Sequence, residues 1–233
     1  MRPRWTPEEG LKLSDPVPAT VAWVAAIVVP HALTALGPAG LLTLRTAHQR
    51  VAAGGNYAPM IDRGAIWRIW TSLFVHVDLV HLLSNAVAVW VLGRVLEPLV
   101  GGWRLSAWMF AGGVAGSYLA HLAGHLQSDG ASGGAFALLG AAVVFGWRYR
   151  RDLPPADART LGPVLGAFLV VNLFLSVVLP FIDLVGHLGG LAAGVGLAAT
   201  EGLRPARALA ILDIAWVLGS VAVCAYGAVR IIA

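Results

Sequence analysis

The chain has 233 residues, of which 58% are hydrophobic and only 12% are charged, and its mean hydropathy is +0.76. Soluble domains carry about 25% charged residues and disordered chains have low hydrophobicity, so the composition excludes both classes. The net charge is +4, but the basic residues separate apolar runs and form no patch, which argues against nucleic-acid binding. The composition therefore predicts an integral membrane protein.

Apolar runs of about 20 residues predict transmembrane helices, because such a helix is long enough to cross the hydrocarbon core. The first run, 17–36, follows a polar segment at 1–16 and is too long for the apolar region of a cleaved signal peptide. Six further runs follow, at 79–99, 104–126, 132–147, 162–180, 184–201 and 207–231. The sequence thus predicts an all-α, polytopic bundle of seven membrane helices.

The connection at residues 45–75 contains Trp67 and Trp70, and tryptophan prefers the headgroup level, so we expect this loop to lie on or partly in the membrane surface. Orientation follows from the basic residues. An N-terminus inside the cell places eleven lysines and arginines on the inner side and five on the outer side, as the positive-inside rule favours. Lys12 is the only lysine, a bias typical of GC-rich genomes that suggests a bacterial cell membrane.

Polar residues inside a membrane helix are costly and indicate a functional site by default. A first group, His76, His81 and Asn85, surrounds the outer end of the second helix. His81 and Asn85 are four residues apart and therefore share one helix face. Hydrogen bonds between neighbouring helices are the alternative role for such a pair, and these residues alone leave both open.

A second group begins the fourth helix, with Gly130, Ser132 and Gly133. The apolar run 133–147 spans about 22 Å, which is less than a hydrocarbon core of about 30 Å. Because Trp147 and nearby arginines hold the inner end at the interface, we expect Ser132 below the outer surface, beside a water-filled cavity. The G-x-S-x-G pattern of α/β-hydrolases needs a preceding strand, whereas 119–126 is predicted to end a helix. A serine N-cap is the structural alternative.

A third group begins the sixth helix, where His187, Gly190 and Gly194 share one face. Glycines beside a histidine allow the backbone of a neighbouring helix to approach closely. Asp183 precedes His187 by one turn, where it would orient the imidazole or, more simply, cap the helix.

Two other histidines, His121 and His125, are one turn apart in the third helix. They have no convincing third metal ligand, so we expect helix–helix hydrogen bonds instead of a metal site. The single cysteine, Cys224, excludes an intramolecular disulfide and a cysteine-based zinc site.

The three groups come together if the helices alternate across the membrane. With the N-terminus inside, the second, fourth and sixth helices all begin at the outer face, which places His81, Ser132 and His187 at similar depth. A hydroxyl beside a neutral imidazole is a nucleophile with its general base. The Ser132 N–H, the Asn85 amide and the His81 ring are candidate donors to an oxyanion. This set predicts acyl transfer, most simply hydrolysis of a peptide bond.

These residues resemble the motifs of the rhomboid intramembrane serine proteases over about residues 60–200. The resemblance rests on motifs in this order: Trp67-Arg68, His76, His81-x-x-x-Asn85, Gly130-x-Ser132-Gly133 and His187-x-x-Gly190-x-x-x-Gly194. It implies a Ser132–His187 dyad and an oxyanion hole formed by His81, Asn85 and the Ser132 amide. It further implies that Phe136 packs on the histidine and that Arg68 braces the first loop.

The resemblance also implies a six-helix catalytic core at 17–202, to which 203–233 adds a seventh helix after the cytoplasmic segment 1–16. It implies no metal or cofactor, and substrates that are single-span membrane proteins cut near the outer face. A rhomboid-like protein that binds membrane clients without cutting them is the alternative, but such members usually lack the serine or histidine. A transporter would place ionisable groups near the midplane, and these groups lie at the outer end. The sequence specifies neither the substrate nor the oligomeric state.

Overall fold

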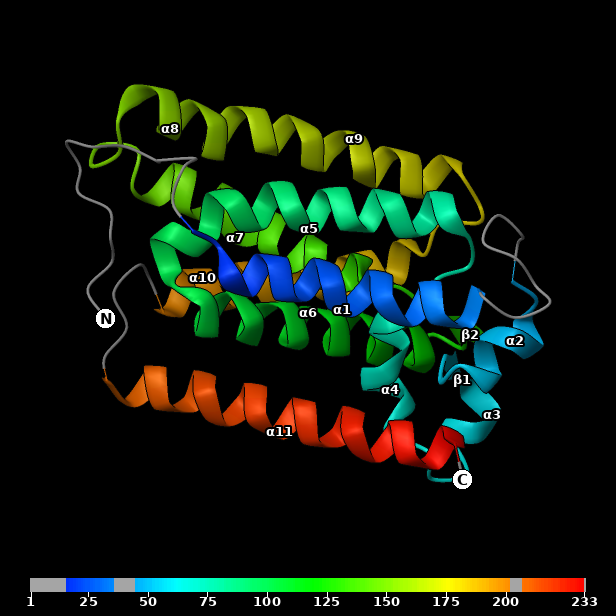
Figure 1. Ribbon diagram of the computed structural model, residues 1–233. Coiled ribbons are helices and arrows are strands. Elements are labelled where there is room, and N and C mark those ends of the chain that lie inside the picture. The colour runs from blue at the N-terminus through cyan, green and yellow to red at the C-terminus, as the bar shows by residue number, and fades with distance from the viewer. Residues whose placement is uncertain (1–15, 36–44, 202–206, 233) are drawn as a thin grey trace.

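The computed structural model describes residues 16–35, 45–201 and 207–232, arranged as a bundle of helices (Figure 1). Except for Pro16, the predicted cytoplasmic segment 1–16 lies outside the described residues, and so does the predicted boundary at 203. The architecture is the predicted all-α membrane bundle.

Seven long helices correspond to the seven predicted spans within the described residues. They are α1 (Pro18–Ala35), α5 (Leu79–Val100), α6 (Gly102–Leu122), α7 (Ser132–Arg148), α9 (Leu165–Val178), α10 (Leu184–Glu201) and α11 (Arg207–Ile232). By length and apolar composition alone, three described stretches qualify as membrane spans, namely Leu79–Val100, Pro155–Val178 and Ala208–Ile232.

Two predicted helix ends are wrong. The third helix ends at Leu122 instead of residue 126, because Gly124 adopts a φ of +81° that a helix cannot continue. The fifth begins earlier than residue 162, since α8 (Pro155–Arg159) and a π-helical turn, η2 (Thr160–Val164), lead directly into α9. Pro155 occupies the first turn of α8, where proline is tolerated because its missing N–H has no partner to lose.

The first loop folds into short elements at the end of the bundle where α5, α7 and α10 begin (Figure 1). These elements are α2 (Ala47–Ala52), β1 (Asn56–Tyr57), α3 (Ala58–Ile61), α4 (Arg68–Thr71) and η1 (Ser72–Phe74). Strand β1 pairs antiparallel with β2 (Gln127–Ser128), with Asn56 opposite Ser128. The sequence did not predict this two-residue strand, which follows the predicted helix end at 119–126 and lies just before Ser132.

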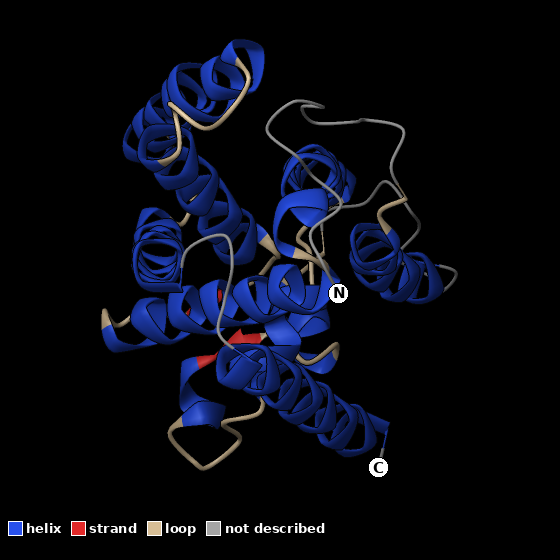
Figure 2. Cartoon of the chain, turned by 90° about the vertical axis from the view of Figure 1, so that its left-hand side faces the viewer, coloured by secondary structure: helices blue, strands red, loops and turns tan. Residues whose placement is uncertain are grey.

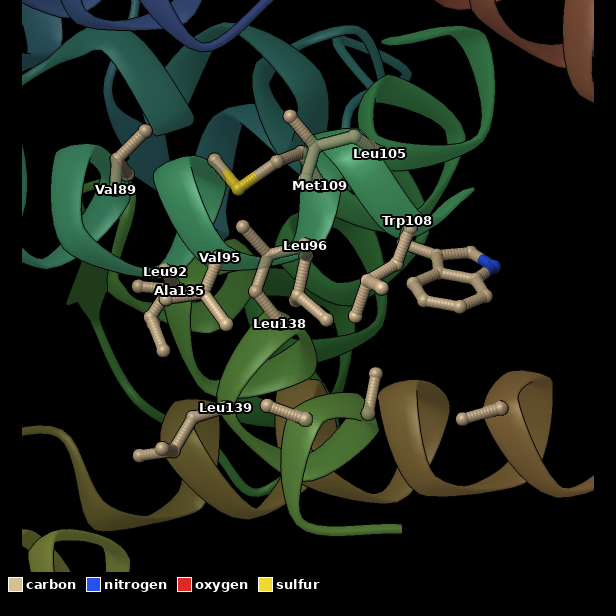
Figure 3. Close-up of a cluster of buried hydrophobic side chains, with 14 of the residues drawn as sticks. Val89, Leu92, Val95, Leu96, Leu105, Trp108, Met109, Ala135, Leu138 and Leu139 are labelled. Carbon is tan, nitrogen blue, oxygen red and sulfur yellow. The ribbon is translucent and has the colours of Figure 1, made fainter. Parts of the chain in front are cut away.

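The centre of the bundle is formed by α6, α7 and α10. A Cβ added at Gly190 would overlap the carbonyl oxygen of Gly133, and one at Gly194 would overlap that of Ala137. Only glycine permits this backbone contact between α7 and α10. Toward α5 and α6 the packing is apolar, with Leu96, Leu105, Trp108, Met109 and Leu138 buried together (Figure 3).

The helices α9 and α11 lie at the periphery, at the top and bottom of the view along the bundle (Figure 2). One attachment of helix α11 is to Arg104 of α6, whose Nε lies 3.4 Å from Asp213 Oδ2 and 3.3 Å from Glu201 Oε2. Glu201 also accepts a hydrogen bond of 3.1 Å from Trp108 Nε1. This buried ionic cluster joins α6, α10 and α11 at the N-terminal end of α6.

Candidate active site

Ser132 is the first residue of α7, and its hydroxyl is free. The N-cap of the helix is Ala131, and no side chain caps it. Within the described part of the chain, the half-buried Ser132 Oγ makes no hydrogen bond. The alternative interpretation, a serine N-cap, is therefore wrong, and the hydroxyl remains available for chemistry.

His187 lies in the first turn of α10 and is 8% exposed. Its ring stacks on Phe136, with centroids 4.1 Å apart and planes inclined by 16°. Phe136 follows Ser132 by about one helical turn, and the Gly133–Gly190 contact joins the same two helix ends. The histidine and the serine therefore occupy the same end of the α7–α10 pair. The described residues include no Ser132–His187 hydrogen bond, and such contacts are often long before substrate binds.

Gly130 lies directly against the polar face of α5. Its φ is +118°, and a Cβ added there would lie 2.9 Å from His81 Nε2 and 3.4 Å from Asn85 Nδ2. Asn85 is 4% exposed, and its Nδ2 has no hydrogen-bond partner among the described residues. An unpaired buried donor costs about 1–3 kcal/mol, so it is rare in a folded protein. The Asn85 Nδ2 group, next to Gly130, is therefore a donor that can serve an acceptor from outside the chain.

His76 is fully buried between two other imidazoles. Its ring centroid lies 6.3 Å from that of His31 and 5.2 Å from that of His81. Burial, with a smaller contribution from His81, lowers the pKa of His76 to about 3. His76 is therefore neutral at physiological pH and packs as an uncharged ring against His81.

Arg68 holds the first loop through backbone carbonyls. Its Nη1 donates to Val51 O at 2.7 Å and to Gly55 O at 3.0 Å, and its guanidinium lies 4.6 Å from the Trp67 ring centroid. The sequence motif Trp67-Arg68 thus corresponds to one cation–π pair at the start of α4, which Arg68 joins to α2 and to the loop after it.

Asp129, the residue before Gly130, is a second point at which the first loop is held. Its carboxylate accepts hydrogen bonds of 2.8 Å from both Arg50 Nη1 and the Asn56 N–H. Burial raises the pKa of Asp129 to about 6, although Arg50 and the Asn56 N–H favour the charged form. The Gly130 N–H donates to Ser72 O at 2.9 Å, so both residues are fixed by the first loop.

The sequence reasoning missed Asp129, Arg50 and Asn56. The position of Asp129 next to Gly130-x-Ser132 was the available signal, whereas nothing local marks its two partners.

Asp183 caps α10, as predicted. Its Oδ1 accepts a hydrogen bond of 2.8 Å from the Gly186 N–H, and its Oδ2 accepts one from Ser128 Oγ. Asp183 Oδ1 also lies 3.3 Å from His125 Nδ1. The carboxylate thus serves the helix end and β2, and it makes no hydrogen bond to the His187 imidazole within the described residues.

The expectation of helix–helix hydrogen bonds for His121 and His125 is wrong, because each histidine faces a carboxylate outside the helix bodies. His121 Nε2 lies 3.3 Å from Asp62 Oδ1, and His125 Nδ1 lies 3.3 Å from Asp183 Oδ1. No group of three potential metal ligands occurs in the described part of the chain.

A small polar cavity adjoins Ser132. Its volume of about 10 Å³ is enough for about one water molecule. Its polar lining comes from Ser72, Ser117, Ser128, Asp129, Ser132 and Asp183.

Comparison with known proteins decides the family. The family model described as Rhomboid domain matches residues 63–204, a range that contains every site residue named from the sequence motifs. The chain belongs to the rhomboid family. As a member of that family it is an integral, multi-pass membrane protein.

Curated rhomboid relatives share about 30% of the residues. Rhomboid protease GluP of Bacillus subtilis is 32% identical over 158 residues, which cover 68% of this chain and 30% of that protein. RHOMBOID-like protein 5 of Arabidopsis thaliana is 31% identical over 153 residues, which cover 63% of this chain and 47% of that protein. Rhomboid-like protease 2 of Toxoplasma gondii is 29% identical over 209 residues, which cover 84% of this chain and 70% of that protein. This rhomboid chain thus spans less than half the length of the first two relatives.

Proposed function

We propose that this rhomboid protein is an intramembrane serine endopeptidase with Ser132 as nucleophile and His187 as general base. One observation carries the proposal most directly. The Ser132 hydroxyl begins α7 unused by any cap, while Phe136, one turn further along the same helix, stacks on His187. A free hydroxyl and an imidazole at one helix end are the parts that acyl transfer requires.

In the proposed reaction, His187 accepts the Ser132 proton as Oγ attacks the scissile carbonyl carbon. His187 then returns the proton to the leaving amine, and water hydrolyses the acyl-enzyme in a second, equivalent cycle. The cavity beside Ser132 has room for that water. No metal or cofactor takes part in this scheme.

The oxyanion would be bound by three donors. These are the Ser132 N–H at the start of α7, where the helix leaves its N–H groups unpaired, the Asn85 amide and the His81 ring. The unpaired Asn85 Nδ2 supports this assignment. Gly130 and Gly133 allow the backbone to pass between these groups, while Trp67, Arg68 and His76 hold the first loop and the back of His81.

The substrates would be transmembrane segments of single-span membrane proteins, cut near the outer face. The distribution of basic residues supports a cytoplasmic N-terminus, with the site open to the outer side, and the scarcity of lysine supports a bacterial inner membrane. We further propose that residues 17–202 form the catalytic core and that α11 is an addition to it.

The test is cleavage of a single-span reporter by the full chain in liposomes, compared with Ser132→Ala and His187→Ala. We expect cleavage by the unmodified protein, and no detectable cleavage by either variant. Thr160→Ala is the control, because it removes an exposed hydroxyl bonded only to Ala156 O. A serine-reactive fluorophosphonate should label the protein only when Ser132 is present. Binding of the reporter without cleavage would instead indicate the client-binding function, and cleavage by Ser132→Ala would refute the dyad.

A further inference from the structure

Ser176 of α9 contacts the side of His187 that the proposed reaction does not use. It is 5% exposed, and its Oγ lies 2.9 Å from His187 Nδ1. The same oxygen lies 2.7 Å from the backbone carbonyl oxygen of Asn172. Asn172 and Ser176 are the two polar side chains in the otherwise apolar helix Leu165–Val178.

These two contacts fix the position of a proton. A carbonyl oxygen only accepts hydrogen bonds, so the Ser176 hydroxyl must donate its single hydrogen to Asn172 O. It then has none for the imidazole, and the hydrogen between Ser176 and His187 must belong to Nδ1. A neutral imidazole carries one N–H, so the other nitrogen, Nε2, keeps its lone pair.

We propose that Ser176 is a positioning residue that holds His187 in the Nδ1–H tautomer and fixes the orientation of its ring. The inference rests on the proposed function, in which Nε2 takes the Ser132 proton and later passes it to the leaving amine. Nδ1 keeps its own hydrogen throughout, bonded to Ser176. Stacking on Phe136 fixes the ring plane, and the Ser176 bond fixes the rotation within that plane.

In a catalytic triad a carboxylate has this orienting role. The nearest carboxylate along the chain, Asp183, is committed to the Gly186 N–H and to Ser128 instead. A neutral hydroxyl suits a buried position on an apolar helix, because an ionised carboxylate there would be expensive to desolvate. The hydroxyl of Ser176 thus orients the histidine without adding a charge.

The kinetic test compares Ser176→Ala and Ser176→Thr with the unmodified protein in liposomes. We expect Ser176→Ala to lower kcat about 3- to 10-fold, as loss of one neutral hydrogen bond predicts, with KM unchanged. Ser176→Thr keeps the hydroxyl and should recover most of the rate. Thr200→Ala is the matched control, since Thr200 Oγ1 also bonds to backbone carbonyls about one turn back, those of Gly196 and Leu197, but is exposed and contacts no imidazole.

The second readout is histidine ¹⁵N NMR of the full chain in nanodiscs, with the His187 signals assigned by their absence in His187→Ala. We expect a protonated Nδ1 and an unprotonated Nε2 in the unmodified protein, and a mixture of tautomers in Ser176→Ala. An Nε2–H tautomer in the unmodified protein would overturn the inference, as would an unchanged kcat and spectrum in Ser176→Ala.

The two proposals fail separately. A chain that cuts no reporter refutes the protease, whereas the His187 spectrum still reports on Ser176. If Ser176→Ala does not fold, the spectrum of the unmodified protein and the rate of Ser176→Thr decide.

Discussion

Asn85 shows how a single residue in this fold is arranged at a cost to stability. Its amide is buried on α5 against Gly130, and Nδ2 has no partner in the described part of the chain. A donor of this kind stabilises nothing in the resting protein, yet it is already desolvated and oriented for an acceptor. Preorganised donors of that type contribute strongly to acyl transfer, because they need no rearrangement when the charge develops.

Asn85→Ala should therefore lower activity without a matching loss of stability. Removal of one oxyanion donor typically reduces kcat about 10²- to 10³-fold, so we expect at least about a 10²-fold loss. The free energy of unfolding should fall by no more than about 1 kcal/mol, because no hydrogen bond of Nδ2 is broken and removal of an unpaired buried donor offsets the packing that is lost. Reporter cleavage and thermal unfolding in detergent measure the two effects. Ser84→Ala on the same helix is the control, since its exposed hydroxyl bonds only to His81 O, and equal activity in both variants would contradict the assignment.

Gly130 has a positive φ and also lies close to two side chains, and comparison with Gly124 distinguishes the effects of these two constraints. Both Gly130 and Gly124 have positive φ, but an added Cβ would meet His81 and Asn85 at Gly130 and nothing within 4 Å at Gly124. Each alanine substitution should cost about 1–2 kcal/mol of stability from the left-handed backbone. Only Gly130→Ala should also abolish reporter cleavage, by displacing the two polar side chains. Retained cleavage in Gly130→Ala would show that this close approach is dispensable.

The sequence anticipates residues whose type is unusual in their local setting. Ser132, His81 and His187 stand out because polar groups are costly in apolar helices, and Gly190 and Gly194 because they repeat on one face. Asp129 and Ser176 do not stand out in this way. Asp129 lies in a polar connection, and the role of Ser176 depends on a contact with a helix eleven residues further along. Their partners are set by tertiary packing, which no local pattern encodes.

At the scale of elements, the first loop is joined to the start of α7 by β1–β2 pairing and by Asp129. The sequence did not predict this pairing, because a two-residue strand has no measurable period and forms only where another segment supplies its partner. The long helices were predictable for the opposite reason, since a run of about 20 apolar residues specifies a membrane helix on its own. The glycine-rich α6 and α10 show the limit of composition, as neither qualifies as a span by hydropathy alone.

The Asp129 anchor should make the stability of this loop depend on pH. Burial raises the pKa of Asp129 from 3.8 to about 6 in the folded chain, so the folded state binds a proton more tightly than the unfolded state does. The stabilisation from this group is therefore complete below pH 3.8 and is lost as the pH rises through about 6. From the pKa difference the whole effect is on the order of 3 kcal/mol.

The measurement is the thermal midpoint in detergent between pH 4.5 and 7.5 for the unmodified protein and Asp129→Asn. The asparagine does not titrate. We therefore expect the thermal midpoint of the unmodified protein to fall relative to that of Asp129→Asn as the pH rises. Asp152→Asn, in an exposed turn, controls for the loss of a carboxylate. Parallel curves for the unmodified protein and Asp129→Asn would contradict the raised pKa.

At the scale of the whole molecule, α11 is attached at both ends of the bundle. Near the first loop, Trp70 Nε1 donates to Ser220 Oγ at 3.3 Å, whereas the ionic attachment to Arg104 lies at the other end of α6, remote from the candidate site. Arg104 is in the first turn of that helix, whereas Ser117, which lines the cavity beside Ser132, is near its last turn. Thirteen residues at 1.5 Å rise separate them by about 20 Å. The rhomboid match ends at residue 204, before α11 begins. The ionic cluster at Arg104 therefore stabilises the bundle from the end remote from the candidate site, whereas the C-terminal half of α11 packs on the first loop.

Asp213→Asn tests that division, because Asp213 and Glu201 share the Arg104 guanidinium, whose side chain is 2% exposed. Loss of one partner of a buried cation should destabilise the protein by about 3 kcal/mol, lowering its thermal midpoint. At a temperature well below that midpoint, kcat and KM for the reporter should stay within about twofold of the unmodified protein, since no site residue moves. Arg230→Gln, an exposed charge on the same helix bonded to Tyr226, should leave both stability and activity unchanged. A fall in kcat at an unchanged midpoint would show instead that α11 acts on the site through α6.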